Sequence, residues 1–266
     1  MSLEIAERAV REGDLDAALE KLQEQIRKKP ADSALRVFLF QLLCVRGEWE
    51  RALSQLSVAA ELDAAALPMA QMYREAIRCE LLRAEVFAGR KSPMILGQPE
   101  QWLALLIESL LTQDSAAHSG DLRARAFEAA PPSAGTLDAE SFEWIGDADM
   151  RLGPVCEAII NGRYYWVPFA HLARVDIEPP SDLRDFVWLP AKFQFANGGE
   201  AVGVIPTRYP GTELSSDGPL RLARKTQWEE KFPQVFHGYG QRILTTDAGD
   251  HPLLEVRSIC VGGTNG

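Results

Sequence analysis

Apolar residues near the start of the chain recur at spacings of three and four, the period of an amphipathic helix. The pattern holds in four successive stretches, and it predicts an all-helical region. The apolar positions are Leu15, Ala18, Leu19, Leu22 and Ile26; Leu35, Phe38, Leu39, Leu42 and Leu43; Trp49, Ala52, Leu53, Leu56 and Ala60; and Met69, Met72, Tyr73 and Ala76. The residues that commonly begin or end helices fall between these stretches: Gly13, Pro30, Gly47 and Pro68.

Two of these glycines belong to an internal repeat. Gly13–Leu19 reads GDLDAAL and Gly47–Leu53 reads GEWERAL, at an offset of 34 residues. That offset is the period of tetratricopeptide repeats, in which helix–turn–helix units stack and bury a shared core. The second copy is degenerate, because Ala64 stands where Pro30 ends the first. An ordinary antiparallel helix bundle is the alternative.

Further along, the pattern changes from helices to strands. Residues 102–107 are apolar on nearly every side, which predicts a buried helix that caps the helical domain, and residues 122–130 predict another helix. The Pro- and Gly-containing segment 129–135 is the candidate linker. We therefore expect an α+β protein with a tetratricopeptide-like helical domain over residues 1–130 and a β-rich domain over residues 131–266.

Short apolar runs separated by turn residues predict three hairpins in the second half. Asn161-Gly162, between the first two runs, suits a type I′ turn. Residues 220–228 fit either a helix or a strand. The runs expected to pair are 155–160 with 164–167, 186–195 with 201–205, and 242–246 with 253–259.

Composition and charge narrow the class of partner. The 266 residues are 46% hydrophobic, and 28 Lys and Arg face 38 Asp and Glu, giving a net charge of −10. Such a chain is a poor ligand for nucleic acid or for an anionic membrane surface, because both require clustered positive charge. The acidic start lacks the apolar core of a signal peptide, and no apolar run is long enough to span a membrane. We expect a cytoplasmic protein.

The chain offers little recognisable chemistry. The four cysteines are scattered without a C-x-x-C pair, which argues against a disulfide scaffold or a zinc site. Asp147, Asp149, Arg151 and Gly153 resemble the start of a calcium loop, but Arg151 stands where an oxygen ligand belongs. Asp147 and Asp149 are instead expected to accept backbone hydrogen bonds or to pair with Arg151. No cofactor or metal site and no catalytic residue is predicted.

An enzyme remains the alternative class. Cys156, His171 and Asp176 could form a nucleophilic triad, because such triads are spatial rather than sequential. However, Cys156 lies in an apolar strand, so it and Cys260 are expected to be buried, inert thiols. A hydrolase-like cleft in the β-rich domain would use Asp185, Arg208 or His237.

Three arginines, Arg184, Arg208 and Arg242, stand next to turns and aromatic residues. We expect them to make internal ion pairs and stacking contacts that hold loops together. The alternative is a recognition surface for an acidic partner segment.

The order of several motifs resembles one known family. The motifs are Phe142–Pro154 (FEWIGDADMRLGP), Gly162–Phe169 (GRYYWVPF), Leu183-Arg184-Asp185, Pro206–Glu213 (PTRYPGTE), Gly240-Gln241-Arg242 and Leu254–Arg257 (LEVR). Together with Phe87-Ala88-Gly89, Pro99 and Trp102, they resemble the ImpE/TagJ family, also called SciE-type virulence proteins, over the whole chain.

The resemblance implies a function that the residues alone do not. Proteins of this family are accessory components of type VI secretion systems. They are cytoplasmic adaptors rather than enzymes, bind the small subunit of the contractile sheath (TssB) and are linked to the sheath-recycling ATPase ClpV. A general tetratricopeptide co-chaperone is a further alternative, but the Lys and Asn clamp of such proteins is not evident.

The repeat also predicts where a partner would bind. In tetratricopeptide repeats the first helix of each pair lines the concave face, and the 34-residue offset places seven residues of the second and third pairs there. They are Val37, Gln41, Cys44, Val45, Gln71, Glu75 and Arg78. This mixed surface suits an amphipathic helix laid into a groove, and the resemblance implies that TssB supplies it. The alternative is that these residues pack against the helix around Trp102 or against the second domain.

Overall fold

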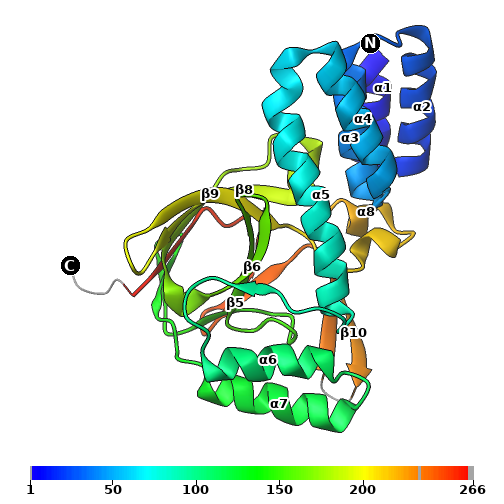
Figure 1. Cartoon of the computed structure of the whole chain (residues 1–266). Coiled ribbons are helices and arrows are strands. Elements are labelled where there is room, and N and C mark those ends of the chain that lie inside the picture. The colour runs from blue at the N-terminus through cyan, green and yellow to red at the C-terminus, as the bar shows by residue number, and fades with distance from the viewer. Residues whose placement is uncertain (1, 233–234, 263–266) are drawn as a thin grey trace.

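A helical N-terminal part and a strand-rich part make up the computed structural model, which describes residues 2–232 and 235–262 (Figure 1). The first part is helical as predicted. Its helices are α1 (Ser2–Glu12), α2 (Leu15–Lys28), α3 (Ser33–Arg46), α4 (Trp49–Leu62) and α5 (Leu67–Phe87), with the 3-10 turn η1 (Ala64–Ala66) before α5.

The repeat corresponds to two helix pairs, α1 with α2 and α3 with α4. Gly13 and Gly47 end the first helix of each pair at φ angles of +83° and +74°, a left-handed conformation that glycine adopts without strain. Asp14 then caps α2, because its side chain accepts a hydrogen bond from the Ala17 N–H. At the 34-residue offset, a left-handed glycine thus ends one helix, and the next helix begins shortly after it.

Two further helices, α6 (Gln101–Leu111) and α7 (Ala116–Ala129), pack against each other. Trp102 and its apolar neighbours on α6 are buried, as predicted. The α6–α7 pair lies at the C-terminal end of α5, however, and not over the helix pairs α1–α4 (Figure 1). The reason is that α5 is a 21-residue helix, which reaches well past the others and presents its last turns to this pair.

Within the described residues, nine strands form one strongly curved sheet (Figure 1). β1 runs parallel to β6, and the other neighbours are antiparallel. In spatial order the strands are β1 (Met94–Ile95), β6 (Arg163–Pro168), β5 (Val155–Ile160), β9 (Glu200–Pro206), β8 (Trp188–Phe195), β7 (Leu172–Ile177), β14 (Ser258–Val261), β2 (Gly135–Leu137) and β3 (Glu140–Phe142).

Smaller elements join the sheet to the helices. Two sheets stand apart from the large one: β10 (Thr226–Phe232) with β11 (Val235–Gly240), and β13 (Gly249–Pro252) with β12 (Ile243–Thr246) and β4 (Ile145–Asp147). The short helical turns are η2 (Phe169–His171), η3 (Leu183–Phe186), η4 (Thr212–Leu214) and α8 (Gly218–Arg221). Residues 220–228, for which the sequence allowed helix or strand, contain both the end of α8 and the start of β10.

Two of the three predicted hairpins are confirmed. β5 and β6 meet at Asn161-Gly162, whose φ angles of +50° and +71° fit a type I′ turn, and β8 pairs with β9. The third prediction is wrong. β12 turns back at once through Asp247 and Ala248 to pair with β13, and β14 joins the large sheet between β7 and β2. Ile259 of β14 is buried there, and local turn signals cannot reveal this pairing.

The hydrophobic core runs across the expected boundary at residue 130. One buried cluster contains Leu22 and Leu56 of the helix pairs together with Trp166 and Trp188 of the sheet, and a second cluster fills the other face of the sheet. The separation into domains 1–130 and 131–266 therefore describes a change in secondary structure. As a division into independent folding units it stays a prediction.

Candidate functional site

The seven predicted partner-binding residues fall into two groups. Gln41, Cys44 and Val45 on α3 are buried, whereas Val37 is half-buried. The burial comes from the chain itself: the Leu183 N–H donates to Gln41 Oε1 at 3.1 Å, and Arg208 Nη1 donates to the Val45 carbonyl at 2.7 Å. The strand-rich part thus covers this end of α3, in line with the alternative of packing against the second domain.

Arg208 is the main contact at this junction. Its buried guanidinium donates to the carbonyls of Cys44 and Val45 near the C-terminus of α3, and to the carbonyl of Arg221 at 2.6 Å. The Cys44 carbonyl also accepts the Gly47 N–H. Burial lowers the pKa of Arg208 from its ordinary value. The contacts of Arg184 are also internal, since it pairs with Asp182 and lies over the Tyr73 ring at 4.9 Å. The expected role of these arginines in holding loops is confirmed.

A buried charge network lies deeper in the junction, and we call it the Glu157 cluster. The carboxylate of Glu157, on β5, accepts hydrogen bonds from two arginines. Arg83 Nε, on α5, donates to it at 2.6 Å, and Arg242 Nη1 donates to it at 3.0 Å. Arg242 Nη2 also donates to Asp147 Oδ2 at 2.6 Å, and the Tyr164 hydroxyl donates to Glu157. All five side chains are buried. Two cations therefore offset two carboxylates inside the protein.

The electrostatics of this cluster follow from burial and pairing. Burial alone would raise the pKa of Glu157, but Arg83 and Arg242 outweigh it and hold that pKa below its ordinary value. For Asp147 burial dominates and raises the pKa to about 6, although Arg242 opposes it. The cluster is a structural network that joins α5 to the sheet, with no side chain left over to act on a substrate.

Asp149 and Arg151 form a neighbouring buried pair. Arg151 Nη2 donates to Asp149 Oδ2 at 2.5 Å, and the Gly238 N–H donates to the same oxygen at 2.9 Å. Asp147 Oδ1 in turn accepts the Asp149 N–H. This confirms that Asp149 pairs with Arg151 and that Asp147 accepts a backbone hydrogen bond. Among the described residues, no three His, Cys, Asp or Glu side chains are grouped so that they could hold a metal ion.

The imagined nucleophilic triad is not assembled. Burial raises the pKa of Cys156 to about 12, which keeps it a thiol. His171 Nε2 faces Glu100 Oε1 at 2.8 Å, and Asp176 pairs with Arg174 at 2.7 Å, so each of the three has a different partner. Cys156 is buried as expected. Cys260 is only partly buried, because β14 lies near the edge of the sheet with two short strands beyond it.

The residues considered for a hydrolase-like cleft also serve separate contacts. The carboxylate of Asp185 accepts the N–H groups of Ser181 and Asp182 and closes the capping box of η3. Burial, and then the charge of Arg151, lower the pKa of His237 to about 4, so it is neutral at pH 7. With Arg208 fixed on α3, the three do not converge on one site.

One of the predicted residues of α5, Glu75, lines an open cavity, which we call the α5 groove. Its volume is about 490 Å³, and it lies between α5 and strands β5, β8 and β9. Glu75 lines it and accepts a hydrogen bond from exposed Arg78 at 2.6 Å. Met72 and Val202 line it too and are 45% and 68% exposed. No sequence motif indicates Val202 as a site residue, and the apolar pattern predicts Met72 only as a core position.

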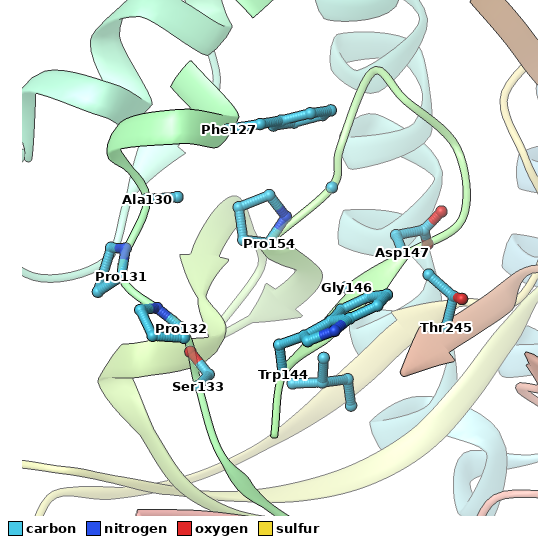
Figure 2. Close-up of a pocket in the computed structure, with 12 residues that line it drawn as sticks. Phe127, Ala130, Pro131, Pro132, Ser133, Trp144, Gly146, Asp147, Pro154 and Thr245 are labelled. Carbon is cyan, nitrogen blue, oxygen red and sulfur yellow. The ribbon is translucent and has the colours of Figure 1, made fainter. Parts of the chain in front are cut away.

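A second cavity, of about 400 Å³, lies at the C-terminal end of α7. We call it the Trp144 pocket. Figure 2 shows the Phe127 ring and the Trp144 indole on opposite sides of the opening, with Pro154 at the level between them. Pro131 and Pro132 follow one side of the pocket (Figure 2). The composition of this proline segment predicts a linker, and no motif in it indicates a pocket.

Comparisons with known proteins identify similar sequences and a similar fold. The sequence model of the family described as "ImpE protein" matches residues 139–260. The type VI secretion system accessory component TagJ of Pseudomonas aeruginosa (strain PAO1) is 50% identical over 258 residues, which cover 96% of this chain and 90% of TagJ. The crystal structure of protein VPA1032 from Vibrio parahaemolyticus superposes with a TM-score of 0.88 at 27% identity, over 97% of both chains. None of the described helices combines the length and hydropathy that crossing a bilayer requires.

Proposed function

The chain belongs to the ImpE family, which includes the type VI secretion accessory component TagJ, and on this premise we propose that it is a non-catalytic adaptor of such a system. The adaptor works in the cytoplasm and binds a helical segment of the sheath small subunit TssB. Through this contact, or through a direct one, it is linked to the ClpV ATPase. It needs no cofactor, nucleic acid or membrane.

One observation carries the proposal: the 50% identity to TagJ extends over 96% of the chain, so it includes both the helix pairs and the strand-rich part. The geometry supports the same conclusion. The buried arginines Arg83, Arg151 and Arg242 pair with buried carboxylates. In contrast, apolar side chains are exposed at the α5 groove. Such a surface suits recognition of another protein better than chemistry on a substrate.

The proposed partner surface is the concave face of α3 and α5. Of its seven residues, Val37, Gln71, Glu75 and Arg78 are at least partly accessible. We place the apolar side of the partner helix over Met72 and Val202 and its charged side toward Glu75 and Arg78. This is the helix-in-groove mode, in which a few apolar anchors give most of the affinity. Contact with Gln41, Cys44 and Val45 would require the loops over α3 to move.

The test is calorimetric titration of purified TssB into the wild-type protein and into Met72→Glu and Val202→Glu. Each substitution puts a charge into the groove at an exposed position, and we expect binding to weaken by about 1–3 kcal/mol. The matched control is Leu62→Glu, an exposed leucine on α4 that does not line the groove. Circular dichroism checks that all variants fold.

The possible outcomes distinguish an error in the binding surface from an error in the adaptor function. If TssB binds and all three variants bind equally well, the adaptor stands and the α5 groove is the wrong surface. If neither TssB nor ClpV is bound, the adaptor proposal is overturned. A hydrolase activity that disappears in a variant of Asp185, Arg208 or His237 would establish the enzyme alternative instead.

A further inference from the structure

The Trp144 pocket is a preformed site that the proposed adaptor function does not use. Phe127 lies directly on the backbone of Gly153, where an added Cβ would be 2.4 Å from the ring atom Cε1. Gly153 has a φ of +52° and packs in turn against Gly146, whose Cβ position is 3.1 Å from the Gly153 carbonyl oxygen. Only glycine permits the approach at Gly153, and a Cβ at Gly146 would be a tight contact. One wall of the pocket is therefore fixed by close backbone packing.

The opposite wall is an aromatic side chain in contact with water. Trp144 is 43% exposed, although Ile145, next to it, is buried. The buried tryptophans all use their indole N–H: Trp102 donates to Glu100, Trp166 to Tyr164 and Trp188 to Glu80. For the indole N–H of Trp144 the described residues provide no acceptor. An apolar face and an unused donor are thus presented together at the mouth of the pocket.

This combination fits an extended, proline-containing peptide. Proline rings pack flat against aromatic side chains, and the carbonyls of a polyproline II helix have no internal partners, so they accept hydrogen bonds from a tryptophan N–H or a hydroxyl. The hydroxyl-bearing residues Ser133 and Thr245 also line the pocket. An α-helical ligand would use its own backbone carbonyls internally, which leaves such donors unmatched.

Charged residues close in sequence to the pocket residues indicate the charge of the ligand. Glu128 follows Phe127, Glu143 precedes Trp144, and Asp247 accepts the Glu143 N–H at 2.7 Å. All three carboxylates are exposed, and none is in an ion pair with a described residue. Three exposed carboxylates therefore belong to the segments that carry Phe127, Trp144 and Thr245, in a chain of net charge −10, and they favour a cationic ligand over an acidic one.

We propose that the Trp144 pocket binds an extended segment of a partner protein in which Lys or Arg flanks one or more prolines. The prolines pack between Phe127 and Trp144, the indole N–H donates to a peptide carbonyl, and the basic residues face Glu128, Glu143 and Asp247. The site is separate from the α5 groove, because the two cavities share no lining residue.

The experiment is an array of short synthetic peptides of equal length, probed with the labelled full chain. Proline-containing peptides with flanking Arg or Lys are compared with the same peptides carrying Ala for Pro, or Glu for the basic residues. We expect the basic proline peptides to bind, and both replacements to weaken binding by about tenfold or more. Amphipathic helical peptides with the same basic residues are included as a further arm.

Variants of the protein assign the binding to the pocket. Trp144→Ala should weaken it by about tenfold or more, while Trp144→Phe, which keeps an aromatic face but lacks the N–H, should weaken it less. Glu143→Lys should weaken it through charge alone. The matched control is Trp228→Ala, which removes a tryptophan exposed to a similar extent on β10. Circular dichroism and thermal melting check the folding of each variant.

Three outcomes would overturn the proposal: no binding to any basic proline peptide, equal binding to the Ala-for-Pro peptides, or a stronger signal from the helical peptides. Wild-type binding that Trp144→Ala leaves unchanged would place the peptide elsewhere and equally overturn it. Titration of Trp144→Ala with TssB should give the wild-type affinity, so failure here and failure of the adaptor proposal can be told apart.

Discussion

The helix pairs α1–α4 and the junction between α5 and the sheet are held together in different ways. In the helix pairs, apolar residues such as Leu22 and Leu56 are buried in one hydrophobic cluster. Ion pairs such as Arg8–Glu12 lie on the surface. At the junction, Arg83 and Glu157 are 74 residues apart and Arg242 and Asp147 are 95 apart, and all four are buried. The first region depends on local pattern and burial, the second on charges from distant segments.

This difference decides how each region responds to change. An exposed ion pair contributes little to stability, since water and salt screen it. A buried pair need not add much net stability either, but the loss of one partner leaves a charge without compensation inside the protein. We therefore expect the largest single-residue effects at the Glu157 cluster.

The strongest test of the comparison is Arg242→Ala. It leaves Asp147 and Glu157 buried without their shared cation, and we expect the free energy of unfolding to fall by about 3–5 kcal/mol. Denaturant unfolding followed by circular dichroism measures this. Arg174→Ala is the matched control, because Arg174 pairs with Asp176 on the surface, and it should cost at most about 1 kcal/mol. Equal effects of the two variants would contradict the comparison.

The counterpart in the helix pairs is Leu22→Ala. Leu22 is fully buried on α2, and its truncation leaves a cavity that should cost about 2–4 kcal/mol. Leu62→Ala, at an exposed position on α4, should cost much less. The same denaturant experiment measures both. A small effect of Leu22→Ala would mean that burial does not dominate this region.

A smaller effect is expected where the two regions touch. Gly47 has a φ of +74°, and a Cβ there would lie 2.6 Å from Glu213 Cβ, so Gly47→Ala combines backbone strain with a clash. We expect a loss of about 1–3 kcal/mol. Gly120→Ala is the control of opposite sign, because Gly120 lies within α7 with nothing within 4 Å of a Cβ. It should stabilise the protein by about 0.5–1 kcal/mol. Thermal melting reports both signs.

The smallest effect is pH-dependent and belongs to the strand-rich part, since α1–α5 contain no histidine. The pKa of His237 is lowered to about 4 in the folded protein, so its contribution to stability is complete above the unfolded value of about 6.5 and is lost as the pH falls toward 4. Because His237 is partly exposed, we expect a loss of about 1–2 kcal/mol.

Unfolding of the wild-type protein and of His237→Gln between pH 7 and pH 4 measures this difference. The variant lacks the titrating group, so its stability should fall less over that range. Parallel curves for the two proteins would show that His237 titrates normally in the folded state.

The same comparison explains how far the sequence could predict the structure. The apolar stripes, the glycines 34 residues apart and the Asn161-Gly162 turn are local signals, and they located the helices and two hairpins. The motif order indicated the family, which the identity to TagJ confirms. In contrast, β14 pairs with β2 and β7, which lie far from it in the sequence, and no local turn signal identifies these partners.

The candidate sites were harder to predict for the same physical reason. A sequence shows that Gln41 and Val45 belong on a concave helix face, but not that Leu183 and Arg208 will cover them. Arg208 and Arg242 were recognised as structural, yet their partners could not be named. The Trp144 pocket forms only where the end of α7, the Gly153 turn and β12 meet, so it exists in the fold and not in any one motif.

The contacts of the turn glycines imply an order of events during synthesis. Gly47 and Gly13 lie against Glu213 and Pro219, so helix pairs made early in translation are completed by a segment made late. Until that segment leaves the ribosome, the nascent chain exposes the C-terminal end of α3, with the apolar residues that Leu183 and Arg208 later cover. Chains released before residue 183 lack both covering contacts, and we expect such premature termination products to be targets for chaperones and proteases.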